Sequence, residues 1–297
     1  MKTKRTLCYL FLVAGSASFA SAMTVLQTTN PTALGAVLDG GAGITINSVT
    51  INNGASGQFG TYTGFSSLPI TLGDGIVMST GLATQTTASY HSTGNAPASN
   101  TGVGSTPEFT NYASGRVANF NSGNDVASLT VHFTLASAGN VKFDWGFGSV
   151  EYPQWTSSFT DAFFAFLDGT STANQIVYDA SHNPVQVGSS FASSLITNET
   201  NTAFSNPHGF MGLTTTTGSL AAGEHSLTFE IGDVNDHDLD SAVFISALQA
   251  LQPGEGGGGG DTPLTEELSS IPEPSTWGTM AMLTGAGLLM RRRKVIL

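Results

Sequence analysis

The sequence contains one cysteine among its 297 residues and few residues of positive charge. Cys8 lies within the first 22 residues, so the remainder of the chain cannot form an internal disulfide bond. Charged residues make up 10 % of the chain, well below the usual fraction of about 25 %. Hydrophobic residues at 40 % suffice for a core, which excludes global disorder. With 36 glycines, this composition is typical of an exported protein rich in strands and turns.

Basic residues are nearly absent from the body of the chain. Of the 9 Lys and Arg residues, three lie in residues 2–5 and four in residues 291–294. Only Arg116 and Lys142 lie between them, against all 21 acidic residues. The body would therefore attract cations and repel anionic lipid headgroups, and it is unsuited to binding nucleic acid.

Residues 1–22 have the three parts of a signal peptide. A positively charged start at residues 2–5 precedes an apolar stretch at 7–14, and residues 20–22 form an A-x-A cleavage site. The apolar stretch is shorter than the ~20 residues that span a membrane, which disfavours the alternative of an uncleaved anchor. We therefore expect export by the general secretory route and a mature chain that begins at Met23.

The segment 141–169 contains the clearest strand signals. Apolar and polar or small residues alternate over residues 141–148, which predicts a half-buried strand. The run 161–167 (DAFFAFL) predicts a strand that is buried on most sides. Core positions are therefore predicted for Phe143, Trp145, Phe163 and Phe166.

The rest of the body predicts an all-β fold. About ten to twelve short strand signals are separated by Gly-rich turns, which is typical of a sandwich. One helix is expected over residues 30–40, with Asn30 as its cap and Pro31 in its first turn. We predict an antiparallel, jelly-roll-like β-sandwich with one short N-terminal helix over residues 23–252.

The C-terminal part has the composition of a linker followed by an anchor. Residues 253–270 are rich in Gly and acidic residues, which predicts a flexible linker. The tail 271–297 contains an apolar run at 278–290 and then the basic cluster 291–294. We predict a C-terminal transmembrane helix there, with the basic end in the cytoplasm and the body outside.

This tail resembles the PEP-CTERM sorting signal of Gram-negative bacteria. The resemblance is carried by Pro272, Glu273 and Pro274, by the apolar run and by the basic cluster, although residues 295–297 extend beyond the usual end. It implies processing by signal peptidase and by an exosortase, with transient anchoring in the inner membrane. The expected destination is the cell surface or the extracellular matrix of a biofilm.

The body resembles the choice-of-anchor L domain. Three segments carry the resemblance: 75–81 (GIVMSTG), 147–169, and 232–245 (GDVNDHDLDSAVFI). Val150 departs from the family pattern, which usually has a Glu there. The resemblance implies a surface location and brings no established activity with it.

The densest group of acidic residues lies in the third of these segments. Alternate aspartates in a loop can supply several of the roughly six to eight oxygens that Ca²⁺ requires. The alternative is a solvated turn whose aspartates cap backbone N–H groups. An EF-hand is excluded, because the required Gly and distal Glu are absent. The candidate ligands are Asp233, Asp236, Asp238 and Asp240, which Glu151 and Asp161 would complete if their loop packs alongside.

Two further functions are compatible with acidic and aromatic residues of the body. Glu151 and Asp161 could form the acid and nucleophile pair of a glycoside hydrolase. Tyr152, Trp155 and Tyr62 could stack on sugar rings or could be ordinary packing groups. We predict a non-enzymatic, structural or adhesive surface protein, associated with exopolysaccharide or other surface proteins; the alternative is a carbohydrate-active enzyme.

Overall fold

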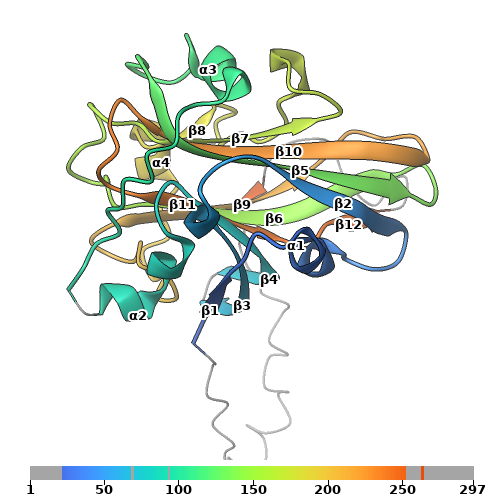
Figure 1. The fold of residues 1–297 in the computed structure, drawn as a ribbon, viewed down its shortest axis with the longest axis horizontal. Coiled ribbons are helices and arrows are strands. Elements are labelled where there is room, and N and C mark those ends of the chain that lie inside the picture. Colours follow the sequence, from blue (N-terminus) through green and yellow to red (C-terminus); the bar gives the residue numbers. More distant parts are fainter. Residues whose placement is uncertain (1–21, 68–69, 93, 252–261, 264–297) are drawn as a thin grey trace, which may run out of the picture. The chain divides into compact units, whose positions relative to one another are not determined.

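The computed structural model describes residues 22–67, 70–92, 94–251 and 262–263. Contacts divide the chain into a unit of residues 1–264 and a unit of residues 265–297, and every described residue belongs to the first. The described part consists mainly of two antiparallel β-sheets (Figure 1). This confirms the predicted all-β, antiparallel class.

The larger sheet contains eight of the described strands, and all their pairings are antiparallel. Its order is β1-β3-β4-β11-β6-β9-β13, and β12 also pairs with β6. The strands are β1 (Thr24–Gln27), β3 (Phe59–Ser67), β4 (Ile70–Ser79), β6 (Asn140–Ser149), β9 (Gly209–Thr216), β11 (Ser241–Ser246), β12 (Gln249–Leu251) and β13 (Thr262–Pro263).

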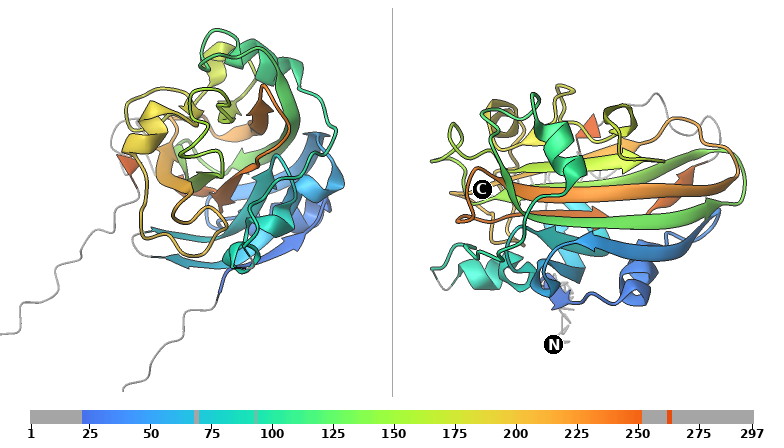
Figure 2. Two further views of the ribbon diagram at one scale, coloured as in Figure 1. Left: turned by 90° about the vertical axis from the view of Figure 1, so that its left-hand side faces the viewer. Right: turned by 45° about the horizontal axis from the view of Figure 1, so that its top comes forward.

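The smaller sheet contains five of the described strands in the order β2-β5-β10-β7-β8. It lies over the larger sheet, as the views in Figure 2 also show. Its strands are β2 (Ile44–Asn53), β5 (Gly123–Leu135), β7 (Ala162–Leu167), β8 (Val185–Gln186) and β10 (Gly223–Val234).

Both sheets bury apolar side chains on their two faces. One hydrophobic cluster lies between the sheets and combines residues such as Trp145 of β6 with Phe163 of β7 and Phe229 of β10. A second cluster includes Val77 of β4 and covers the other face of the larger sheet. A third includes Phe166 of β7 and covers the other face of the smaller sheet. Burial on both faces explains why β7 reads as a continuous apolar run and not as an alternating one.

The two strand predictions for the segment 141–169 are confirmed. In β6, buried and half-buried residues alternate over its first half, and the second half is entirely buried. In β7, all residues but Leu167 are buried. The four proposed core residues are at most 1 % exposed: Phe143, Trp145, Phe163 and Phe166.

The predicted N-terminal helix is present as α1 (Pro31–Leu38). Asn30 caps it, because its side chain accepts hydrogen bonds from the backbone N–H groups of Thr32 and Ala33. The expectation of a single helix was wrong, since the described residues contain three further short α-helices. They are α2 (Ala88–His91), α3 (Pro107–Ala113) and α4 (Ser189–Ser193), and the 3₁₀ turns are η1 (Ser56–Gln58), η2 (Ala83–Thr86) and η3 (Thr172–Asn174).

The predicted signal peptide and sorting tail lie outside the described residues. This applies to residues 1–21, to the predicted transmembrane helix at 278–290, and to Pro272, Glu273 and Pro274. None of the helices in the described part of the chain is long and apolar enough to cross a membrane.

Candidate metal centre

Five of the predicted acidic ligands lie where strands of the two sheets end. Glu151 follows β6 of the larger sheet, and Asp161 immediately precedes β7 of the smaller sheet. Asp233 lies near the end of β10, while Asp236 and Asp240 belong to the loop that joins β10 to β11. Because β6 pairs with β11 and β7 pairs with β10, these strand ends bring the loops of both sheets together.

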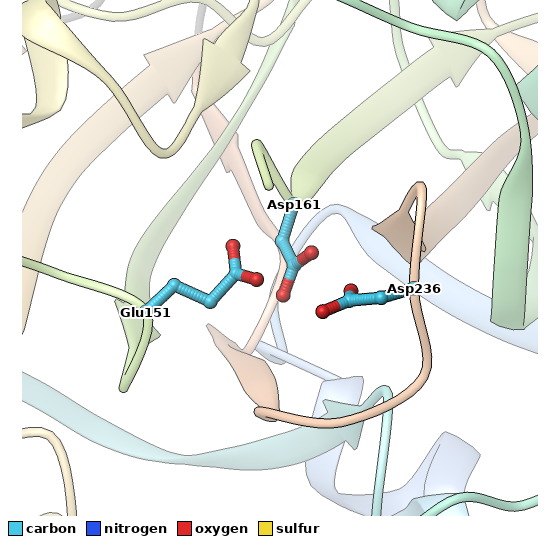
Figure 3. Close-up of side chains that lie close together, drawn as sticks. All are labelled: Glu151, Asp161 and Asp236. Atoms are coloured by element: carbon cyan, nitrogen blue, oxygen red, sulfur yellow. The ribbon is translucent and has the colours of Figure 1, made fainter. Parts of the chain in front are cut away.

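Three of these carboxylates form a compact group. Glu151, Asp161 and Asp236 each offer one oxygen, and these oxygens all lie within 4.8 Å of one another. Figure 3 shows the three side chains directed toward a common point. Glu151 and Asp161 are fully buried, and Asp236 is half-buried. From the sequence, participation of Glu151 and Asp161 depended on their loop packing beside the aspartate-rich loop, and the positions of the three oxygens meet this condition.

Asp161 is held in place by hydrogen bonds from two neighbouring strands. Its Oδ1 accepts from the backbone N–H of Val234 at 3.1 Å, and its Oδ2 accepts from the hydroxyl of Ser241 at 2.7 Å. Asp240 accepts a bond from the backbone N–H of Ser99 at 2.9 Å. These bonds fix two carboxylates with respect to the sheets.

The acidic cluster consists of this group together with Asp233 and Asp240, and other carboxylate oxygens in it accept no such hydrogen bond. Within the described residues, both oxygens of Glu151 and of Asp233, and one oxygen each of Asp236 and Asp240, are buried without a hydrogen bond. Buried polar atoms are nearly always paired, and an unpaired one costs about 1–3 kcal/mol. A cation placed among these side chains would satisfy several such oxygens at once.

Burial raises the pKa of every carboxyl group in this cluster. It raises the pKa of Glu151 to about 11, with the nearby charge of Asp161 adding to the effect. The pKa of Asp161 rises to about 7, although the bonds from Ser241 and Val234 act in the opposite direction. Without a cation, several of these groups would therefore be protonated near neutral pH.

The remaining aspartates show the same effect of burial. Burial raises the pKa of Asp236 to about 6, and the charge of Asp238 adds to this. It raises the pKa of Asp240 to about 7 despite the bond from Ser99, and that of Asp233 well above its ordinary value. The cluster thus favours any partner that would let these groups ionise.

Gly81 makes room for one member of the cluster. A Cβ atom at this position would lie 1.8 Å from Oδ2 of Asp240. The backbone N–H of Thr80 donates to the carbonyl of Ser241, so the Ser-Thr-Gly turn is fixed beside the start of β11. Gly81 therefore leaves the space that the carboxylate of Asp240 occupies.

Asp125 was not singled out from the sequence, yet it is fully buried beside this region. Its φ of 47° is left-handed, and its Oδ1 accepts bonds from the hydroxyl of Thr101 and the backbone N–H of Val103. Its Oδ2 lies 3.0 Å from Nδ1 of His237, in the aspartate-rich loop. No spacing in the sequence connects residues 125 and 237, so only the fold brings them together.

Asp238 differs from the other proposed ligands. It is exposed and does not belong to the group formed by Glu151, Asp161 and Asp236. The buried set supplies carboxylate oxygens only, which suits a hard divalent cation such as Ca²⁺. The donor set thus fits the predicted cation, with three candidate direct ligands and Asp233 and Asp240 beside them.

The burial of Glu151 and Asp161 argues against a glycoside hydrolase. Such an enzyme places the sugar linkage between its two carboxyl groups. Both side chains here are 0 % exposed, and they direct their oxygens toward each other and Asp236. The space between these two carboxyl groups is therefore closed to a glycosidic linkage in this arrangement, whereas Asp236 is half-buried.

The three candidate sugar-stacking aromatics have different surroundings. Tyr62 is fully buried and packs edge-on against Phe244, with the ring centroids 5.4 Å apart, which agrees with the alternative of an ordinary packing group. Tyr152 is half-buried and packs edge-on against Phe191 at 5.7 Å. Trp155 is 40 % exposed and is therefore the candidate best placed to contact a ligand.

One known family matches this chain. The model of the family described as Choice-of-anchor L domain matches residues 24–249, which is most of the chain and nearly all of the described part. Neither the curated proteins nor the solved structures contain a significant match.

Proposed function

This chain belongs to the choice-of-anchor L domain family, and we propose that it is an envelope or matrix protein whose domain is stabilised by a bound Ca²⁺ ion. Membership of the family indicates a surface-associated, non-enzymatic protein. A structural or adhesive role, in association with exopolysaccharide or other surface proteins, agrees with the acidic body and with the inaccessible carboxylate pair.

The observation that carries the cation proposal is the set of buried carboxylate oxygens without partners. The two basic side chains of the described body do not compensate them. The guanidinium of Arg116 lies over the ring of Tyr112, at 5.0 Å from its centroid. Nζ of Lys142 lies 3.8 Å from Asp144. A divalent cation would supply the missing positive charge and would relieve the repulsion among the carboxylates.

A cation at this position would connect the two sheets. Glu151 is attached to the end of β6 in the larger sheet, and Asp161 to the start of β7 in the smaller sheet. Asp236 belongs to the loop by which the chain passes from β10 to β11. One ion bound to all three would therefore fix the loops at this end of the sandwich.

Calcium should raise the melting temperature of residues 23–264, which belong to the first unit of the chain. Binding to the folded state alone contributes about 2.7 kcal/mol at a hundredfold excess of the ion over its Kd. For a domain of this size we expect a shift of roughly 5–10 °C between a Ca²⁺ sample and a chelated sample. Mg²⁺ should do less, because it requires a tighter octahedral geometry.

Two variants test whether the shift in melting temperature arises from the group of Glu151, Asp161 and Asp236. Glu151→Gln removes a central ligand charge and should abolish most of the shift. Asp238→Asn changes an exposed aspartate outside the group, so it should retain most of the shift. Identical melting of the unmodified protein in Ca²⁺ and in chelator would disprove the cation proposal.

The two ends of the chain would determine the proposed localisation. A signal peptide at 1–22 would start export, and the tail 271–297 would anchor the protein transiently in the inner membrane. An exosortase would then cut near Pro272, Glu273 and Pro274. The body would be delivered to the cell surface or to the extracellular matrix of a Gram-negative bacterium.

The secreted protein should therefore lack both ends. Mass spectrometry of the native extracellular form should detect no peptide from residues 277–297. Substitution of Glu273 should leave the protein in the inner membrane fraction, whereas Glu255→Gln in the linker should not change its location. An intact tail on the secreted protein would contradict this assignment.

A further inference from the structure

A pocket of about 480 Å³ adjoins the acidic group. Its lining comes from the loop after β6 and from the loop between β10 and β11, and consists of Trp155, Phe159, Asp236, Asp238 and Leu239. The volume lies within the range of about 300–1,000 Å³ that is typical of small-molecule sites. The pocket therefore has the size and the mixed polarity of a ligand site.

The aromatic wall of this pocket is held by backbone hydrogen bonds. The N–H of Trp155 donates to the carbonyl of Glu151 at 2.8 Å, and the N–H of Phe159 donates to the carbonyl of Trp155 at 3.1 Å. The two rings are edge-to-face, with centroids 6.1 Å apart. The backbone at Trp155 is thus held in place, and its indole ring, which is 40 % exposed, offers a flat apolar surface to a ligand.

The lining of the pocket also contains a candidate ligand of the cation. Asp236 belongs to the compact group with Glu151 and Asp161, and it also lines the pocket. Ca²⁺ takes about six to eight oxygens, of which three carboxylates supply between three and six. A cation in the group would therefore lie beside the pocket with coordination positions left for another molecule.

We propose that this pocket binds a neutral saccharide, with one sugar face on Trp155 and two hydroxyl groups completing the coordination of the cation next to Asp236. The proposal rests on the proposed function, because it requires the cation. It names the class of ligand that the surface protein would recognise: a polyhydroxylated, uncharged sugar unit of a polysaccharide.

The charges of the walls favour a neutral sugar over an anionic or a cationic ligand. Asp238 is exposed in the wall and would repel an acidic sugar, yet it can accept hydrogen bonds from hydroxyl groups. With the cation bound, the charge of Asp236 is already compensated, which weakens the attraction for a Lys-rich peptide. Hydroxyl oxygens suit the cation, and the C–H face of a sugar suits the indole ring.

Tryptophan fluorescence can report on this pocket directly. Residues 23–264 contain Trp145 and Trp155. Trp145 is 0 % exposed, and its Nε1–H donates to the hydroxyl of Thr215 at 2.9 Å. A change in emission on addition of a sugar would therefore arise from Trp155.

The experiment combines an array of neutral, acidic and amino-group-bearing oligosaccharides with fluorescence titration of the best neutral probe, in Ca²⁺ and in chelator. We expect binding of a neutral probe in Ca²⁺ and at least a tenfold loss in chelator. Trp155→Ala should cause a similar loss and Trp155→Phe a smaller one. Leu26→Ala, which also truncates a large exposed apolar side chain, should cause no change. Each variant should keep the Ca²⁺-dependent rise in melting temperature.

The outcomes separate this proposal from the one on which it rests. A Ca²⁺-dependent melting shift without binding of any neutral oligosaccharide would overturn the saccharide site and leave the cation site intact. Absence of the melting shift would overturn both. Binding of the amino-group-bearing oligosaccharides alone would identify a cationic ligand and would also overturn the proposal, as would sugar binding that is the same in chelator.

Discussion

Glu151→Gln should stabilise the protein in chelator at about pH 8 and destabilise it in Ca²⁺ at the same pH. In the cation-free protein, burial raises the pKa of Glu151 to about 11, so the folded state keeps this carboxyl protonated. In the unfolded chain the same group ionises above about pH 4.3. The folded state therefore binds a proton that the unfolded state has released.

The sign of the pH dependence follows from this difference in bound protons. Where the folded state binds more protons, stability falls as the pH rises, by about 1.4 kcal/mol for each pH unit and each such group. Between about pH 5 and pH 8, the proton bound to Glu151 in the folded state would lower the free energy of unfolding of the unmodified protein by about 4 kcal/mol. Glutamine carries no ionisable proton, so its advantage in chelator should be small at the lower pH and grow toward the higher pH.

In Ca²⁺ the unmodified protein should be more stable than Glu151→Gln. The ionised Glu151 then acts as a ligand of the cation, and glutamine supplies no negative charge. Urea denaturation in Ca²⁺ and in chelator, at both pH values, measures the free energy of unfolding. The control is Glu224→Gln, which neutralises an exposed glutamate of β10 and should have little effect under any of these conditions. The same sign of effect for Glu151→Gln in both media would contradict the role of Glu151 as a ligand.

Phe163→Ala should lower the free energy of unfolding by about 3–5 kcal/mol, the usual cost of truncating a buried aromatic side chain. Phe163 is 0 % exposed between the sheets. Its ring lies 5.5 Å from that of Trp145 in the larger sheet and stacks with Phe229 of the smaller sheet at 6.4 Å. The surrounding strands are paired on both sides and cannot collapse freely into the cavity.

Chemical denaturation in Ca²⁺ measures this effect. Leu26→Ala removes an apolar side chain that is 70 % exposed and should cost less than about 0.5 kcal/mol. A similar small value for Phe163→Ala would place the Phe163 ring outside the core. Because Phe163 lies two residues from Asp161, the Ca²⁺-dependent melting shift should also be recorded to separate loss of packing from loss of the cation.

The strands near the centre of the fold could be predicted because their burial leaves a local trace in the sequence. Alternation over the first half of β6 and the Phe-rich run of β7 both reflect which faces are covered. Helix α1 could be predicted from Asn30 and Pro31 for the same reason, since a cap and a first-turn proline are local signals. The pairing of the strands with one another leaves no such local signal in the sequence.

Helix α3 was missed although its start carries a recognisable signal. Thr106 caps it by accepting from the N–H of Phe109, and Pro107 occupies its first turn. The helix has only seven residues and follows a long polar stretch, so its apolar positions show too few turns to reveal a period. Its Phe109 and Tyr112 pack on Phe164 of β7, a contact that only the assembled sheet provides.

The residues of the acidic site could be predicted from the sequence, but their burial and their positions relative to one another could not. The density of aspartates pointed to residues 233–240, and the nearby aromatic loop suggested Glu151 and Asp161. Nothing local distinguishes the buried Asp233 from the exposed Asp238, because their burial depends on loops from distant strands. The same holds for Asp125 and for the space that Gly81 leaves beside Asp240.

The position of β11 in the larger sheet determines the order in which the molecule can be assembled during its synthesis. Ala242 pairs with Ser79 of β4 on one side and with Gly148 of β6 on the other, so the last long strand lies between two much earlier ones. Until residues 241–246 emerge, β4 and β6 have no strand to join them. Sheets closed by such distant pairings fold slowly. We therefore expect the larger sheet to close only after residues 241–246 are available.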